Sequence, residues 1–273
     1  MLLKILLVFF ISLSVYAKEI TLASLYNSFS MSKDEAKKAS IIWKKEMKKE
    51  YPKYDFNVIL YKDAKKILKD YIDKKIQVII ADEQFYFRNK KELENLSNYI
   101  YILSNNEKVF HQFYLLKNKK SDLKNTKNLK AIFRYYPSLN WLKSLNLDIK
   151  DIKRVENEKK LIFDVFFNKN SISVVKKELY DSMIELNPQI TKRIEVIKKS
   201  KTIFIDALGF MRSDDDKINR IFNASTKRIN SSNSNFEVNQ YIQLQKLFLL
   251  KDKELKPLYD FYKNNNFIKA KNE

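Results

Sequence analysis

Strand-like and helix-like segments alternate along the first part of the chain, and this order restricts the fold more than any other feature. The three predicted strands are 19–25, 56–61 and 77–81, and the two predicted helices between them are 32–51 and 64–72. The last strand is a continuous apolar run, which is typical of a strand buried on both faces of a parallel sheet. Strands joined through helices pair in parallel, so this order predicts a doubly wound α/β sheet.

A second run of the same kind begins near residue 129. Its predicted strands are 129–133, 172–175 and 193–197, and its predicted helices are 137–145, 161–166 and 179–186. One more strand is predicted over 203–210, followed by helices over 214–229, 235–250 and 254–263. We expect the strand 203–210 to return to the first sheet. The predicted architecture is therefore two doubly wound lobes joined by two crossovers, with a cleft at the carboxyl ends of the strands.

The N-terminus has the features of a cleavable secretory signal. Lys4 supplies a positive charge, residues 5–15 are apolar, and Val15 and Ala17 place small side chains where a signal peptidase cleaves. The apolar run is shorter than the roughly 20 residues that span a bilayer, which disfavours the alternative of an uncleaved anchor. We therefore expect residues 1–17 to be removed and the mature chain to work as a soluble protein in the periplasm.

Composition excludes several kinds of site. The chain has no Cys and a single His, which rules out disulfides, a thiolate nucleophile and a His-rich metal site. No nucleophile-elbow or zinc-protease motif is present, so we expect no enzyme, no metal and no cofactor. The formal net charge is +20. In an exported protein this charge indicates codon bias and solubility, or a field that attracts anions or anionic membranes, rather than nucleic-acid binding.

Four stretches of the chain, taken in order, resemble a known family. They are Tyr61–Ala64 with Ile76–Ala81, Tyr114–Ser121 with Leu129–Phe133, Ser173–Pro188, and Ser200–Asp214. Together they resemble the type II periplasmic substrate-binding proteins, in the phosphate- and phosphonate-binding (PhnD-like) branch that serves ABC transporters. The resemblance covers nearly the whole mature chain. It implies a monomer with the two-lobed fold, a small anionic or zwitterionic ligand, and a membrane permease as partner.

The chain departs from this branch at the place that holds the ligand. The branch uses a Ser/Thr-rich turn at a helix N-terminus, and the matching residues here are Tyr136-Pro137-Ser138-Leu139-Asn140. Only Ser138 keeps a Ser/Thr-type hydroxyl group, and Pro137 has no N–H to donate. The chain contains one Gly, which excludes a Gly-rich phosphate loop.

The expected division of the chain follows from the two predicted crossovers. It assigns 1–17 to the signal peptide, 18–115 to the first part of lobe 1, 116–200 to lobe 2, and 201–273 to the return to lobe 1 with the C-terminal helices. Side chains that follow the predicted strands should then face the cleft. The candidate ligand-binding residues are Tyr26, Ser28, Tyr61, Glu83, Gln84, Tyr136, Ser138, Asn140, Lys176 and Asp206.

Each candidate also has a structural alternative. Ser138 and Asn140 lie at a helix start, where they either bind an anionic group or only cap the helix. Asp206 lies in an apolar strand and needs a partner, which is either a ligand amine or a salt bridge at the hinge. Glu83 follows Asp82, and such paired carboxylates can act in acid/base chemistry, but without a partner His or metal ligands we expect a surface role or an amine-binding role. Lys176 contacts either an anion or solvent.

Three functions are consistent with these patterns. The leading prediction is a periplasmic solute-binding protein that closes two lobes over its ligand and delivers it to an ABC permease. The alternative is a ligand-sensing adaptor for a membrane sensor kinase or receptor. A secreted hydrolase is a third possibility, which the missing catalytic motifs disfavour.

Overall fold

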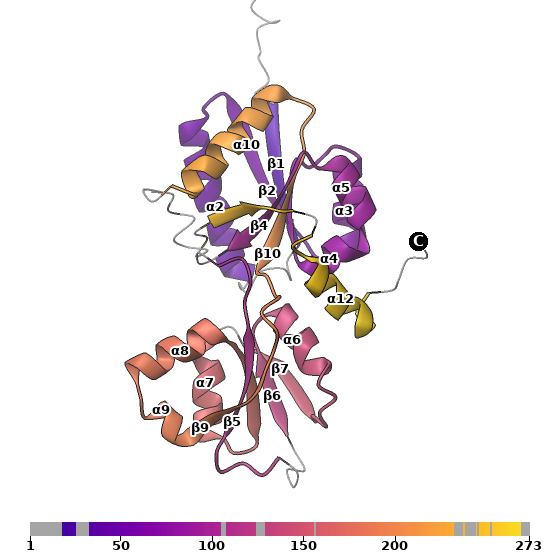
Figure 1. Cartoon of the computed structure of the whole chain (residues 1–273). Helices are drawn as coiled ribbons and strands as arrows, with labels where there is room; N and C mark the ends of the chain where they lie inside the picture. The colour runs from indigo at the N-terminus through magenta and orange to yellow at the C-terminus, as the bar shows by residue number, and fades with distance from the viewer. Residues whose placement is uncertain are drawn as a thin grey trace, which may run out of the picture.

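The computed structural model describes residues 18–25, 33–104, 108–123, 129–155, 157–231, 237, 244, 246–251 and 253–268. The predicted signal peptide and the candidates Tyr26 and Ser28 lie outside these residues. The described chain forms two separate β-sheets, each covered by helices, and Figure 1 shows them as an upper and a lower lobe. We call the lobe that contains the first strand lobe 1 and the other lobe 2.

Lobe 1 is built on a mixed sheet of six strands in the order β11-β4-β10-β3-β1-β2. These strands are β1 (Lys18–Leu25), β2 (Tyr54–Tyr61), β3 (Val78–Ala81), β4 (Tyr99–Ser104), β10 (Ala207–Met211) and β11 (Lys246–Leu249). Strand β1 pairs in parallel with both β2 and β3, whereas β10 pairs antiparallel with β3 and β4. The helices of this lobe are α2 (Lys33–Glu50), α3 (Ala64–Ile72), α4 (Glu83–Arg88), α5 (Lys90–Leu96) and α10 (Asp216–Ile229).

Lobe 2 is built on a five-stranded sheet in the order β7-β6-β8-β5-β9. Its strands are β5 (Phe113–Asn118), β6 (Lys130–Phe133), β7 (Asp151–Arg154), β8 (Ser171–Lys176) and β9 (Ile194–Lys199). Strand β6 is parallel to β7 and β8, and β5 is antiparallel to β8 and β9. Helices α6 (Tyr136–Lys143), α7 (Glu158–Phe167), α8 (Lys177–Leu186) and α9 (Ile190–Arg193) complete the lobe.

The chain passes between the sheets twice, from β4 to β5 and from β9 to β10. The two crossovers touch through an isolated antiparallel bridge, in which the backbone N–H of His111 donates to the backbone carbonyl oxygen of Phe204 at 2.7 Å. Strands β1 and β10 belong to the same sheet, on either side of β3. The structure therefore confirms the predicted return of the chain to the first lobe and the hinge of two crossovers.

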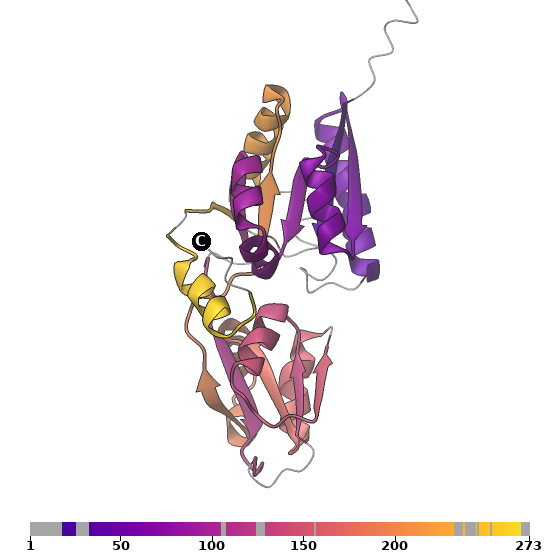
Figure 2. The same ribbon diagram turned by 90° about the vertical axis from the view of Figure 1, so that its right-hand side faces the viewer.

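Helix α12 (Lys256–Asn264) lies beside the region where the lobes meet (Figure 2). One continuous cluster of buried apolar side chains contains Phe113 and Trp141 of lobe 2, Phe204 of the second crossover, and Leu258 and Tyr262 of α12. We use the word junction for the crossover residues 108–112 and 200–206 together with the residues that contact them. The buried apolar contacts make the junction a packed region rather than a loose linker.

Some predicted elements differ from the observed ones. Residues 246–249 form strand β11 rather than the end of a helix, because the free edge of β4 offers unpaired backbone groups to this short apolar run. Residues 203–206 form the crossover, so β10 begins only at Ala207. Helix α10 is capped by Asp215 rather than Ser213, because the Asp215 carboxylate accepts a hydrogen bond from the backbone N–H of Lys217 at 2.7 Å.

Candidate functional site

Charged side chains from lobe 2 and from both crossovers meet at the junction. Lys176 ends β8, and its ammonium is bonded to the carboxylate of Asp206 in the second crossover. His111, in the first crossover, places its Nε2 3.0 Å from the other carboxylate oxygen of Asp206. The side chains of Lys176, Asp206 and His111 are only 8%, 17% and 1% exposed. Three charged or titratable groups thus form one buried network across the hinge.

The pKa shifts in this network reflect its charges. Burial raises the pKa of Asp206, but the positive charge of Lys176 and the hydrogen bond from His111 outweigh burial and hold it well below its usual range. Burial lowers the pKa of His111, yet its contacts with Asp206 and Glu178 outweigh that effect and raise the pKa above the ordinary value of 6.5. Asp206 is therefore ionised at neutral pH and serves as the counter-ion of Lys176.

The same ammonium lies next to the start of helix α6. Its Nζ atom is 4.4 Å from the ring centroid of Tyr135, the N-cap residue of α6, which is within the range of a cation–π contact. The guanidinium of Arg134 lies 5.9 Å from the same ring, and that of Arg154 lies 5.3 Å from the ring of Tyr136. Three cations and the positive end of a helix dipole therefore surround the place where the sequence predicts ligand binding.

Within α6, the predicted ligand residues Ser138 and Asn140 already have protein partners. The hydroxyl of Ser138 is fully buried and donates to the carbonyl oxygen of Tyr135 at 2.6 Å. The side-chain amide of Asn140 donates to the hydroxyl of Tyr262 at 3.0 Å. These bonds tie the first turns of α6 to its own N-cap and to helix α12.

A second polar cluster connects the two lobes through α12. The Tyr262 hydroxyl donates to Oε1 of Glu83 at 2.5 Å, and Asn140 donates to the Tyr262 hydroxyl. Glu83, the first residue of α4, is 0% exposed, so the surface role considered for it is wrong. Its Oε2 atom has no hydrogen-bond partner among the described residues. Tyr262 is thus a bridge between lobe 1 and lobe 2.

Glu83 is a neutral acid at neutral pH. Burial, together with the negative charges of Asp82 and Asp206, raises its pKa from 4.5 to about 8. Burial and the proximity of Glu83 raise the pKa of Tyr262 as well. The cluster therefore carries no charge around pH 7, and Oε2 of Glu83 is a buried carboxyl oxygen available for one more hydrogen bond.

The remaining predicted residues, Tyr61, Gln84 and Tyr136, each have a partner within the protein. Tyr61 ends β2, and its hydroxyl donates to Asp70 of α3 at 2.8 Å. The Gln84 amide donates to the carbonyl oxygen of Phe267 at 2.9 Å, which ties α4 to the segment after α12. The Tyr136 ring packs edge-on against Phe133. The structure therefore brings together Lys176, Asp206, Tyr136, Ser138, Asn140, Glu83 and Gln84 around the junction and α12, while Tyr61 bonds within lobe 1.

Sequence reasoning missed Tyr262 and Glu178. Tyr262 occupies an apolar position of an amphipathic helix, so no motif distinguishes it from a core residue. Glu178, in the first turn of α8, lies 3.8 Å from His111 Nδ1 and 3.9 Å from the ammonium of Lys108. Its position directly after Lys176 and Lys177 gave no signal, because neighbouring charges of opposite sign are common on solvated helices.

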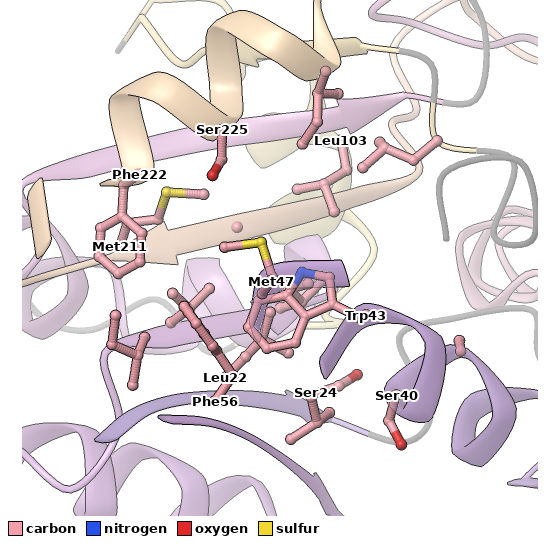
Figure 3. A pocket seen from close by; sticks show the side chains of 18 of the residues that line it. Leu22, Ser24, Ser40, Trp43, Met47, Phe56, Leu103, Met211, Phe222 and Ser225 are labelled. Carbon is pink, nitrogen blue, oxygen red and sulfur yellow. The ribbon is translucent and has the colours of Figure 1, made fainter. Parts of the chain in front are cut away.

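A separate apolar pocket lies within lobe 1, away from these charges. It has a volume of about 170 Å³ and lies between the sheet and helices α2 and α10 (Figure 3). Its lining includes Leu22, Trp43, Met47, Met211 and Phe222. A charged solute would lose its hydration there without gaining polar partners. The pocket is therefore not the candidate site for an anion.

Among the described residues, no group of three or more His, Asp or Glu side chains is arranged to hold a metal ion. None of the described helices is both long enough and apolar enough to cross a membrane.

Comparison with known proteins supports the fold. No family model and no curated protein matches the chain. The binding protein component of an ABC phosphonate transporter from Pseudomonas aeruginosa superimposes with a TM-score of 0.60 at 14% identity, over 92% of this chain and 87% of the other. PhnD1 from Prochlorococcus marinus, in complex with methylphosphonate, gives a TM-score of 0.57 at 14% identity, over 92% and 100% of the two chains.

A Xanthomonas citri protein bound to chloride ion is similar to the same degree, with a TM-score of 0.61 at 8% identity over 91% of this chain and 99% of the other. At such low identity these likenesses concern the fold alone. They confirm the two-lobed architecture of the type II periplasmic binding proteins that the sequence predicts.

Proposed function

We propose that this chain is a periplasmic solute-binding protein that holds a small anionic solute between its lobes and delivers it to an ABC permease. The observation that carries the proposal is the arrangement at α6, where a helix N-terminus and the cations Arg134, Arg154 and Lys176 gather around Tyr135 and Tyr136. Backbone N–H groups and positive charge at one place favour an oxyanion. Two of the similar structures come from phosphonate-binding proteins, which supports the same ligand class.

The proposal includes the predictions about processing and organisation. Residues 1–17 act as a cleavable signal, the mature chain is a soluble periplasmic monomer, and it catalyses no reaction. The first lobe boundary lies before β5 (Phe113–Asn118), whose residues pair within the sheet of lobe 2, rather than at 115/116, and the second lies at 200/201. Tyr26 and Ser28 contribute to the site from lobe 1. Closure of the lobes over the ligand creates the form that the permease recognises.

Binding of a panel of oxyanions tests this function. The mature chain is titrated by isothermal calorimetry with methylphosphonate, inorganic phosphate, methanesulfonate and 2-aminoethylphosphonate. At least one should bind, and it should also raise the melting temperature, since a ligand that binds only the folded state stabilises by about 2.7 kcal/mol at one hundred times its Kd. Absence of binding to every member of the panel would overturn the proposal.

A pair of serine variants tests whether the ligand binds at the N-terminus of α6. Ser138 and Ser144 lie at opposite ends of this helix, and each donates its hydroxyl to the carbonyl oxygen three residues earlier, both at 2.6 Å. When the ligand binds, the Ser138 hydroxyl should turn its single proton from the Tyr135 carbonyl oxygen to the anion. Ser138→Ala should therefore weaken binding by about tenfold, the loss expected for one hydrogen bond to a charged group. Ser144→Ala removes an equivalent local bond far from the N-terminus and should leave the affinity unchanged.

A further inference from the structure

The junction contains an ammonium group that belongs to the protein itself. The Lys176 side chain is 8% exposed, and its Nζ atom contacts the Asp206 carboxylate on one side and the ring of Tyr135 on another. Tyr135 is the N-cap of α6, so this cation is part of the proposed anion site rather than of a distant surface. Its neighbour Lys177 provides a contrast, because it is 41% exposed and pairs with Asp181 on the same helix.

The carboxyl groups around this ammonium are already committed. The Asp206 carboxylate accepts one hydrogen bond from Lys176 and another from His111. Glu83 is held by Tyr262 and, with a pKa raised by burial to about 8, carries no charge at neutral pH. Neither group therefore offers an unpaired negative charge to a ligand.

Other acidic side chains around α6 and the crossovers also have partners within the protein. Asp82 caps α4 and accepts the N–H of Phe85 at 2.8 Å. Glu178 lies between His111 and Lys108. Glu158, at the start of α7, is 3.7 Å from Nε of Arg134. Asp82, Glu178 and Glu158 thus each face a cation or a backbone donor of the protein.

We infer that this protein selects oxyanions that carry no ammonium group of their own, and that Lys176 is the residue that determines this specificity by occupying the Asp206 carboxylate. The inference rests on the proposed function and narrows its ligand class. An alkylphosphonate, an alkylsulfonate or inorganic phosphate fits this chemistry. An aminoalkylphosphonate or an amino acid does not.

The physical reason lies in the cost of exchanging one ammonium for another. A ligand ammonium could reach Asp206 only by displacing Lys176, which would leave a buried cation without its counter-ion. If Lys176 stayed in place, the ligand ammonium would instead face a like charge at short range. Replacing Lys176 by a neutral side chain removes both obstacles and exposes the carboxylate of Asp206 to the ligand.

Two ligands that differ only in the ammonium test this inference. Methylphosphonate and aminomethylphosphonate are titrated by isothermal calorimetry into the wild-type mature chain, Lys176→Gln and Lys177→Gln. The wild type and Lys177→Gln should bind methylphosphonate at least about tenfold more tightly than the amino compound, a difference of ~1.4 kcal/mol. In Lys176→Gln this preference should disappear or reverse. A thermal melt of each variant shows that it is folded.

A second variant covers the case in which Lys176→Gln does not fold. Asp206→Asn removes the carboxylate and releases the Lys176 ammonium, so it should bind methylphosphonate more tightly than the wild type and still reject the amino compound. The inference is overturned if the wild type prefers the amino compound, if Lys176→Gln keeps the wild-type ratio, or if Asp206→Asn gains affinity for the amino compound. Binding of neither ligand, nor of the other anions, contradicts the proposed function instead.

Discussion

The ammonium of Lys176 is bonded to the carboxylate of Asp206, although the two residues lie 30 positions apart and belong to different parts of the fold. Lys176 ends a strand of lobe 2, whereas Asp206 lies in the crossover that returns the chain to lobe 1. Both side chains are largely buried. The pair therefore holds the second crossover against lobe 2 at the place where a hinge motion would be centred.

Breaking this pair should be costly for stability. Asp206→Asn leaves the buried ammonium of Lys176 without its counter-ion, and we expect a loss of about 3–5 kcal/mol in the free energy of unfolding, measured by urea denaturation. The matched control is Asp181→Asn, which breaks the exposed pair with Lys177 and should cost less than about 1 kcal/mol. Equal losses in the two variants would contradict a special role for the junction pair.

The single histidine of the chain reports on the same network. The pKa of His111 is raised above 6.5 by its carboxylate partners, despite burial. An NMR titration of its imidazole should therefore give a midpoint above 6.5 in the wild type and a lower one in Asp206→Asn. Because the folded-state pKa is the higher one, His111 contributes stability that is complete below about pH 6.5 and is lost as the pH rises through the folded-state pKa. A midpoint that Asp206→Asn leaves unchanged would argue against the contact.

Glu83 should make stability fall between pH 5 and pH 8. Its pKa is about 8 in the folded state and near 4.5 when exposed, so across this range the folded state binds more protons than the unfolded state, and the free energy of unfolding decreases as pH rises. Glu83→Gln removes this dependence, and its stability relative to the wild type should increase by up to about 1.4 kcal/mol per pH unit.

Urea denaturation of both proteins from about pH 5 to about pH 9 measures the effect, with a plateau expected above pH 8. Glu185→Gln is the control, since Glu185 lies exposed on α8, and its difference from the wild type should stay constant with pH. A constant difference for Glu83→Gln as well would show that Glu83 is ionised throughout.

The Tyr262 hydroxyl should be needed for stability. Tyr262→Phe leaves both Glu83 and Asn140 without the partner that joins them, and we expect a loss of about 1–3 kcal/mol in the free energy of unfolding. Tyr259→Phe is the control, because the Tyr259 ring packs against the same Phe87. In the double variant with Glu83→Gln the two effects should not add. Strict additivity would mean that the two side chains are independent.

Several elements were predictable because local chemistry specifies them. The apolar run that ends at Ala81 is buried between β1 and β10 as its composition requires. Asp63 caps α3 by accepting the backbone N–H of Lys65 at 2.8 Å, as the sequence order predicts. The strand at residues 246–249 was not predictable, because a short apolar run is compatible with either a helix or a strand. Its pairing with the edge of β4 decides between them.

The candidate site was predictable only as a set of positions. Side chains that follow the strands were expected at the cleft. Lys176 and Asp206 meet at the junction, Glu83 and Asn140 meet Tyr262 of α12, and Ser138 bonds at the N-cap of α6. Ser138 bonds to Tyr135, three positions earlier. The partners of the other residues were not predictable, because those bonds join residues far apart in the sequence. Tyr262, for example, reaches Glu83 over a separation of 179 positions.

The sequence by itself determined the order of strands and helices, the helix start at α6 and the excess of positive charge, because these depend on neighbouring residues and composition. Only the tertiary structure decided that Lys176 is a buried cation with a counter-ion and that Glu83 is a buried acid bound to Tyr262. The physical reason is that burial and distance set the protonation state and the pairing of an ionisable group, and both arise only when distant segments pack together.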